Sequence, residues 1–146
     1  MISKQPISTK QPQANWPIHQ LPGLKESDAE KLEHHGIETT RQLLQKTQQP
    51  ADLETLAAQL QVHLPRLKKW RAMADLAQIP SVGCKYCGLL PHSGIGSRQQ
   101  LAKIPVHRLH QQVLRFYVSN MQRRDLCPEV SRVATWIAQA QRFPHP

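Results

Sequence analysis

A segment of 24 residues occurs twice in this chain, and this duplication restricts the possible folds more than any other feature of the sequence. Residues 21–44 align without a gap with residues 79–102, at a constant offset of 58. Nine aligned pairs carry the same or a similar residue: Leu21 and Ile79, Pro22 and Pro80, Leu24 and Val82, Leu32 and Leu90, His34 and His92, Gly36 and Gly94, Ile37 and Ile95, Gln42 and Gln100, and Leu43 and Leu101. So many matches at one offset indicate a single supersecondary unit that is used twice.

Each copy carries the signals of helices joined by tight turns. Gly36 and its counterpart Gly94 lie where a helix is expected to end, because glycine adopts the left-handed conformation at a helix C-terminus without strain. Thr39 or Thr40 then begins a short helix. Further helices are expected over residues 53–62, 65–77 and 105–124, and from Pro128 onward. The sequence therefore predicts an all-α fold in which each repeat is a helical hairpin followed by two further helices, packed as one domain.

The domain boundaries follow from composition. Residues 1–14 are rich in Gln, Pro, Ser and Thr, with few large apolar side chains, which predicts a disordered tail. The helical domain is expected over 15–146, with repeat one at 15–78 and repeat two at 79–143. No apolar stretch approaches the roughly 20 residues of a membrane-spanning helix, and three cysteines without a secretory signal fit reduced thiols. A cytoplasmic protein that does not bind membranes is therefore expected.

The positive charge of the chain is concentrated in its second half. The formal net charge is +9, yet residues 21–78 contain eight Lys and Arg against eight Asp and Glu. Residues 79–146 contain nine Lys and Arg against only Asp125 and Glu129, a net charge of +7. Such a surplus indicates an acidic partner, either nucleic acid (DNA or RNA) or an acidic protein surface.

Four sequence segments resemble a known family. They are WPIHQLPGL at 16–24, WRAMADLAQIPSVGCKYCGLL at 70–90, LHQQVLRFYV at 109–118 and RRDLCP at 123–128. Together with the duplicated turns, they resemble an uncharacterised domain family of mainly phototrophic bacteria built from tandem helix-hairpin-helix repeats. The resemblance covers about residues 15–143 and implies two tandem helix-hairpin-helix repeats, but no particular reaction.

The resemblance also suggests where nucleic acid would bind. In the nucleic-acid-binding form of the motif, a Gly-x-Gly hairpin lets backbone amides approach a phosphate. Each hairpin here keeps one glycine, Gly23 or Gly83, and the second is favoured because no acid lies near it. The predicted nucleic-acid-binding residues are Gly83, Lys85, Arg98, Lys103, Arg108, Arg115, Arg123 and Arg124, with Tyr86, Phe116 or Tyr117 available to stack on bases.

A competing interpretation assigns these cations to ordinary solvated helix faces. The protein would then be an interaction adaptor, or an assembly or regulatory factor, that docks on an acidic protein surface. No Ser/His/Asp set, paired carboxylates or Gly-rich phosphate loop followed by Lys is present in the sequence. A non-enzymatic binding protein without a cofactor is therefore expected.

The cysteines allow three interpretations. Cys84 and Cys87 have the spacing of a zinc or redox pair, and Cys127 with His110 would complete a tetrahedral zinc site. A redox-sensitive thiol pair is the second interpretation. Core packing is favoured, because Cys87 aligns with Ala29, a small position on the buried face of the first helix.

Overall fold

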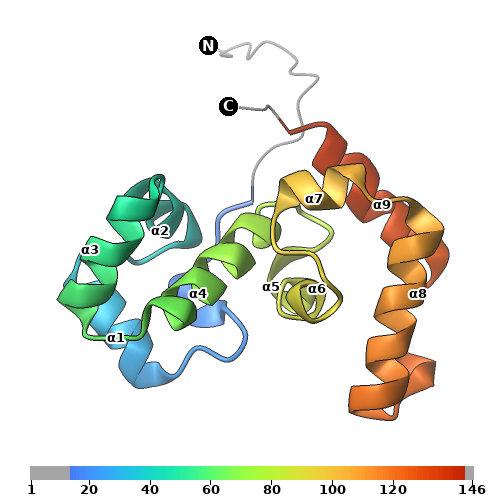
Figure 1. Ribbon diagram of the computed structural model, residues 1–146, viewed down its shortest axis with the longest axis horizontal. Coiled ribbons are helices and arrows are strands. Elements are labelled where there is room, and N and C mark those ends of the chain that lie inside the picture. Colours follow the sequence, from blue (N-terminus) through green and yellow to red (C-terminus); the bar gives the residue numbers. More distant parts are fainter. Residues whose placement is uncertain (1–13, 144–146) are drawn as a thin grey trace, which may run out of the picture.

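The computed structural model describes residues 14–143, and this part of the chain is all-helical. The elements are η1 (Ile18–Gln20), α1 (Glu26–His34), α2 (Thr40–Lys46), α3 (Pro50–Leu60), α4 (Leu64–Ala77), α5 (Gly83–Tyr86), α6 (Leu89–His92), α7 (Arg98–Lys103), α8 (Val106–Phe116), η2 (Tyr117–Met121), η3 (Arg124–Leu126) and α9 (Val130–Gln141). In Figure 1, α1 to α4 form the left part of the molecule, α5 and α6 lie beside α4, and α8 extends downward on the right. No helix among the described residues has the length and apolarity that a membrane span needs. The tail predicted at 1–14 lies outside the described residues except for Ala14.

The helix ends in the two copies of the duplicated segment have the same local geometry. Gly36 and Gly94 have φ values of 79° and 89°. The following isoleucine donates its backbone N–H to a leucine carbonyl at 2.9 Å in both copies, from Ile37 to Leu32 and from Ile95 to Leu90. This bond is typical of a helix that ends in a left-handed glycine. The prediction that each glycine ends a helix is therefore confirmed.

The next helix is also capped in the same way in both copies. The hydroxyl of Thr39 accepts the Gln42 amide at 3.2 Å, and the hydroxyl of Ser97 accepts the Gln100 amide at 3.1 Å. Each glutamine side chain accepts a backbone N–H from the residue four positions earlier, at 2.6 Å. These bonds satisfy amides that would otherwise lack a partner at a helix start. The description of the whole chain as two tandem helix-hairpin-helix repeats goes beyond these bonds and stays a prediction.

One continuous hydrophobic core joins the elements into a compact domain. Leu67, Trp70 and Met73 of α4 are buried in this core, as is Trp136 of α9. Two tryptophans also fix the junction between the copies. The indole of Trp16 donates to the Ala77 carbonyl at 2.8 Å, and that of Trp136 donates to the Ser81 carbonyl at 3.2 Å.

Several predicted helix boundaries are wrong. The helix expected over 53–62 runs instead over Pro50–Leu60, with Pro50 at its first position. The helix expected over 105–124 stops as an α-helix at Phe116, and η2 continues it as a π-helical turn that ends where Gln122 has a φ of 52°. Pro128 is not the first residue of the last helix, because Glu129 still has the extended backbone of an N-cap, with φ −70° and ψ 159°. The first buried residue of α9 is Val133, so the first turn of the helix lies outside the core.

Candidate nucleic-acid interface

Helix α8 presents an arginine-bearing face to solvent. Its apolar residues Leu109 and Val113 are buried, and α8 packs against α9. Arg108 and Arg115 are exposed and lie seven residues apart, so they share the opposite face of the helix at a separation of about 10 Å along its axis. No Asp or Glu occurs in α8, so nothing on this helix offsets their charge.

Between residues 103 and 124, four exposed cations make no ion pair with any residue of 14–143. They are Lys103 at the end of α7, Arg108 and Arg115 on α8, and Arg124 in η3. We call these four residues the basic arm. Their positive charge is available to an external partner, because the described chain does not neutralise it.

Arg123, although next to the basic arm, is neutralised. Its guanidinium donates to both carboxylate oxygens of Asp125, at 3.1 and 3.0 Å. The hydrogen bonds from Arg123 lower the pKa of Asp125, and the same bonds raise the pKa of Arg123. Arg123 therefore compensates one of the two acids in the second half and contributes little net charge to the surface.

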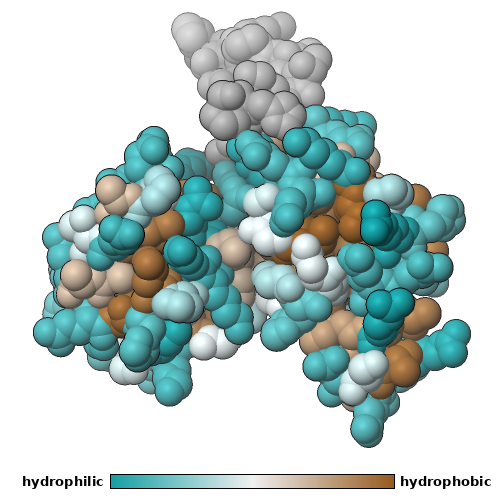
Figure 2. Space-filling view, viewed as in Figure 1, coloured by the Kyte–Doolittle hydropathy of each residue, from teal (hydrophilic) through white to brown (hydrophobic). Residues whose placement is uncertain are grey.

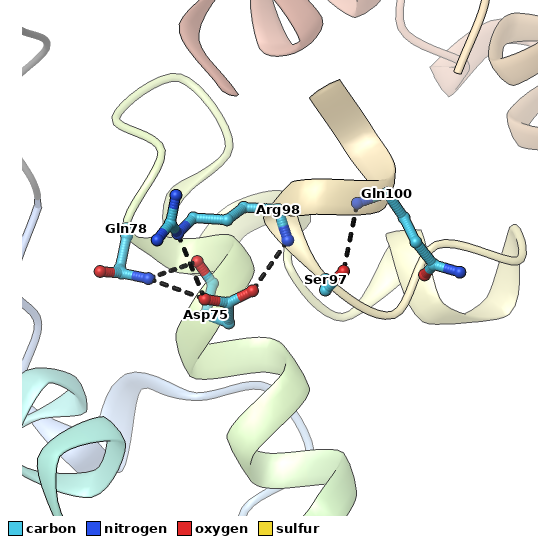
Figure 3. A network of polar contacts seen from close by, with 5 residues as sticks. All are labelled: Asp75, Gln78, Ser97, Arg98 and Gln100. Carbon is cyan, nitrogen blue, oxygen red and sulfur yellow. Dashed lines mark hydrogen bonds and ion pairs between the residues drawn. The ribbon is translucent and has the colours of Figure 1, made fainter. Parts of the chain in front are cut away.

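Arg98, another predicted binding residue, lies inside the molecule. Its side chain is 13% exposed and its Nε lies 3.5 Å from a carboxylate oxygen of Asp75 in α4 (Figure 3). The backbone N–H of Arg98 donates to the other oxygen of Asp75 at 2.8 Å, and the guanidinium stacks 5.2 Å from the ring centre of Phe143. Asp75 also accepts a bond from the Gln78 amide at 2.9 Å. Arg98 therefore connects α7 to α4 and is not part of the exposed basic surface.

Gly83 is placed differently from a phosphate-binding glycine. It is buried, and its N–H donates to the Ile79 carbonyl at 2.9 Å. A Cβ at this position would lie 3.0 Å from Cζ2 of Trp16, and the φ of 50° also favours glycine. In this conformation the Gly83 amide has its partner inside the protein. The glycine is required for the approach of Trp16, and this packing does not leave the amide open to a phosphate.

Lys85 is exposed and belongs to a groove between the two halves of the chain. We call this cavity of about 350 Å³ the central groove. Figure 2 shows that the surface is indented between the first half of the chain and the segment that contains α8. The lining residues are Pro22, Gly23, Lys69, Met73, Lys85, Gly88, Leu89, His92, Phe116, Tyr117 and Met121. The lining combines an apolar floor with two lysines, and it includes no carboxylate.

The three aromatic side chains expected to stack on bases have partners within the protein. Tyr117 is only 8% exposed, and the ring of Tyr86 lies 5.0 Å from that of Trp136. Phe116 stacks on His92 with ring centres 5.2 Å apart and planes 21° from parallel. This pair separates the central groove from a second cavity of about 400 Å³, which Arg115 also lines.

Lys69 lies outside the predicted set although it faces the central groove with Lys85. It belongs to residues 21–78, where acids and bases cancel in number, so the charge count gives no signal for it. His92 is visible in the sequence through its match to His34, but its contact with Phe116 depends on the packing of α6 against α8. Both residues are recognised only once the tertiary structure is known.

The cysteines do not assemble a metal site in the described chain. Within residues 14–143, no three His, Cys, Asp or Glu side chains gather in a way that could hold a metal ion. Cys127 lies 4.0 Å from Nε2 of His110, but Cys84 and Cys87 do not complete a cluster with them. Cys87 is fully buried and Cys84 is half-buried. The prediction that Cys87 packs in the core is confirmed.

Comparison with known proteins identifies the family. A family model described as a domain of unknown function (DUF4332) matches residues 22–143. This match includes every α-helix, the basic arm and all three cysteines. No curated protein and no solved structure matches the chain. Because the family model covers most of the sequence, the chain belongs to the DUF4332 domain family.

Proposed function

We propose that this protein binds the sugar–phosphate backbone of nucleic acid through the basic arm, without sequence specificity and without catalysis. The observation that supports this most directly is the set of four exposed cations, Lys103, Arg108, Arg115 and Arg124, that lack an ion-pair partner among the described residues. Each cation that contacts a phosphate releases a condensed counterion, and this release drives sequence-independent binding.

The placement of Arg108 and Arg115 on one helix face supports the proposal further. Two guanidinium groups on a shared face can approach one strand together, and a guanidinium pairs with phosphate oxygens in a bidentate geometry. Binding through the basic arm also differs from the phosphate contact that the backbone amides of a Gly-x-Gly hairpin make. Arginine side chains, rather than hairpin amides, would make the contacts, since the Gly83 amide is already bonded inside the protein.

A binding titration over a range of salt concentrations tests the proposal. The double variant Arg108→Gln/Arg115→Gln removes two charges from the basic arm, and Arg41→Gln/Lys68→Gln removes two exposed charges from α2 and α4 in the first half. We expect the slope of log K against log salt to fall by about 2 in the first variant and to remain close to wild type in the second. Fluorescence anisotropy with a random-sequence duplex and a random-sequence single strand provides the measurement.

Equal effects of the two double variants would contradict the proposal, because binding would then depend on the total charge of the protein and not on the position of the charges. Absence of wild-type binding to both oligonucleotides at about 50 mM salt would also overturn it.

Docking on an acidic protein surface is the second candidate function. The exposed large apolar side chains found in the described chain all fall between residues 118 and 130: Val118, Met121, Leu126 and Val130, each at least 36% exposed. Exposed apolar groups beside arginines are typical of protein interfaces. This candidate predicts capture of a protein partner from extract that survives nuclease treatment, whereas the nucleic-acid proposal predicts loss of captured material after that treatment.

A further inference from the structure

Cys84 and Cys87 occupy unlike environments although they are only three residues apart. Cys84 lies in the first turn and is half-buried, while Cys87 follows the helix and is fully buried. Hydrogen bonding between the two thiols shifts the pKa of both groups. Cys87 keeps a helical backbone after α5, so the two side chains, three residues apart, project from the same side of the helical turn.

The backbone spacing also suits a bond between them. Residues three apart in an α-helix have Cα atoms about 5 Å apart. Native disulfides join cysteines whose Cα atoms are about 4.4 to 6.8 Å apart. A bond between Cys84 and Cys87 therefore requires rotation of the two side chains and little movement of the backbone.

The local fold around this pair departs from the first copy of the duplicated segment. In the first copy α1 continues without a break from Glu26 to His34, whereas in the second copy Cys87 and Gly88 separate α5 from α6. Packing holds α5 at both ends, since Gly83 lies against Trp16 and Tyr86 lies against Trp136. The two thiols therefore lie within and directly after a short helix whose backbone is held by packing, at a position where α1 continues unbroken.

The hydrogen bond makes the two thiols chemically unequal. It lowers the pKa of Cys84, because the Cys87 thiol stabilises the Cys84 thiolate. It raises the pKa of Cys87 far above its ordinary value, and burial acts in the same direction. The more accessible sulfur is thus the better nucleophile, and the buried one keeps its proton until it acts.

We propose that Cys84 and Cys87 form a thiol–disulfide exchange pair that is oxidised by small disulfides and closes to an intramolecular disulfide. The Cys84 thiolate attacks one sulfur of a small disulfide, forms a mixed disulfide and releases the first thiolate. The Cys87 sulfur then attacks the sulfur of Cys84, and the second thiolate leaves. Two electrons and two protons pass from the pair to the small disulfide, which becomes two thiols.

Oxidised glutathione is the probe for this reaction, and trypsin reports which bond forms. Trypsin cleaves after Lys85, between the two cysteines, and so separates peptide 72–85 from peptide 86–98 in the reduced protein. After oxidation we expect these two peptides to remain joined, with a combined mass about 2 Da below that of the two thiol peptides. Cys127 should remain a free thiol that can still be alkylated, because burial raises its pKa and slows its attack on oxidised glutathione, and because it has no neighbouring thiol among the described residues.

Two variants test the order of the steps. Cys87→Ala places in the core the residue that Ala29 supplies at the aligned position, so the fold should tolerate it. This variant should accumulate glutathione on Cys84, because no second sulfur is present to release it. Cys84→Ser should form neither the mixed disulfide at this site nor the joined peptides. Cys127→Ser is the matched control and should oxidise as the wild type does.

The assay contains no nucleic acid, so its outcome is independent of the proposed binding function. The inference is overturned if the wild-type protein keeps three alkylatable thiols in excess oxidised glutathione. It is overturned equally if a stable mixed disulfide accumulates on wild-type Cys84, or if Cys127 reacts before Cys84 does.

Discussion

At the scale of single residues, two glycines show how the duplicated turns differ. The first hairpin places Gly23 in the left-handed region with φ 75°, and a Cβ there would meet nothing within 4 Å. In the second copy Ser81 aligns with Gly23, and the left-handed residue is Gly83, two positions further along the chain. The turn in the second copy is therefore built around its contact with Trp16 rather than around the geometry of the first turn.

Alanine at these two glycines should have unequal effects on stability. Gly83→Ala combines left-handed strain with a contact against Trp16 at 3.0 Å, and we expect it to lower the free energy of unfolding by about 2–4 kcal/mol. Gly23→Ala carries only the backbone strain, about 1–2 kcal/mol. Chemical denaturation measures both values. A loss at Gly83 no larger than the loss at Gly23 would mean that Trp16 does not constrain the position.

The role of Cys87 could be predicted from sequence, whereas those of Gly83 and Arg98 could not. The gap-free alignment places Cys87 on Ala29, and both are buried because the two helices turn the same face to the core. The same alignment gives no information about Trp16, which approaches Gly83 from a segment that precedes the first copy. A charge count likewise treats Arg98 and Arg115 as equal, although only the structure shows that Asp75 neutralises Arg98.

At the scale of elements, the existence of the helices follows from the sequence more reliably than their ends. Glycine and capping residues fix the C-terminal end of α1 and the starts of α2 and α7, because these signals act within a few residues. The break between α5 and α6 has a tertiary contact beside it, since a Cβ on Gly88 would lie 3.0 Å from the Cβ of Pro22. Glycine and capping signals near Gly88 in the sequence cannot predict this contact, because Pro22 is distant along the chain.

Arg98, at the contact between α4 and α7, should contribute to stability, whereas Arg115 on α8 should contribute to binding. Arg98→Gln removes the charge that faces Asp75, whose side chain is only 14% exposed, and we expect a loss of about 1–3 kcal/mol in the free energy of unfolding. The salt slope of nucleic-acid binding should stay at the wild-type value. Arg115→Gln should do the reverse, because Arg115 is exposed and makes no ion pair with the described residues.

Thermal denaturation measures the stability of Arg98→Gln and Arg115→Gln, and fluorescence anisotropy measures their binding, so each variant is compared by both properties. If Arg98→Gln weakens binding as much as Arg115→Gln while both proteins stay folded, Arg98 contacts the ligand and its assignment to the α4–α7 contact is wrong.

At the scale of the whole molecule, residues 21–78 are neutral and residues 79–146 are strongly basic. The structure keeps this difference on the surface, since α8 extends away from the first half and carries two of the four residues of the basic arm (Figure 1). The central groove lies between the halves and takes one lysine from each, Lys69 and Lys85. The sequence indicates the asymmetry of charge, but only the packing of α4 beside α5 and α6 creates the groove.

The location of bound nucleic acid can be measured directly by titrating a random-sequence single strand into isotopically labelled protein and following backbone amide chemical shifts. We predict that the shifts concentrate between residues 103 and 124, where Lys103, Arg108, Arg115 and Arg124 lie, and that α2 and α3 remain unchanged. Shifts confined to the first half of the chain, or a spectrum that does not respond at low salt, would contradict the assignment of binding to the basic arm.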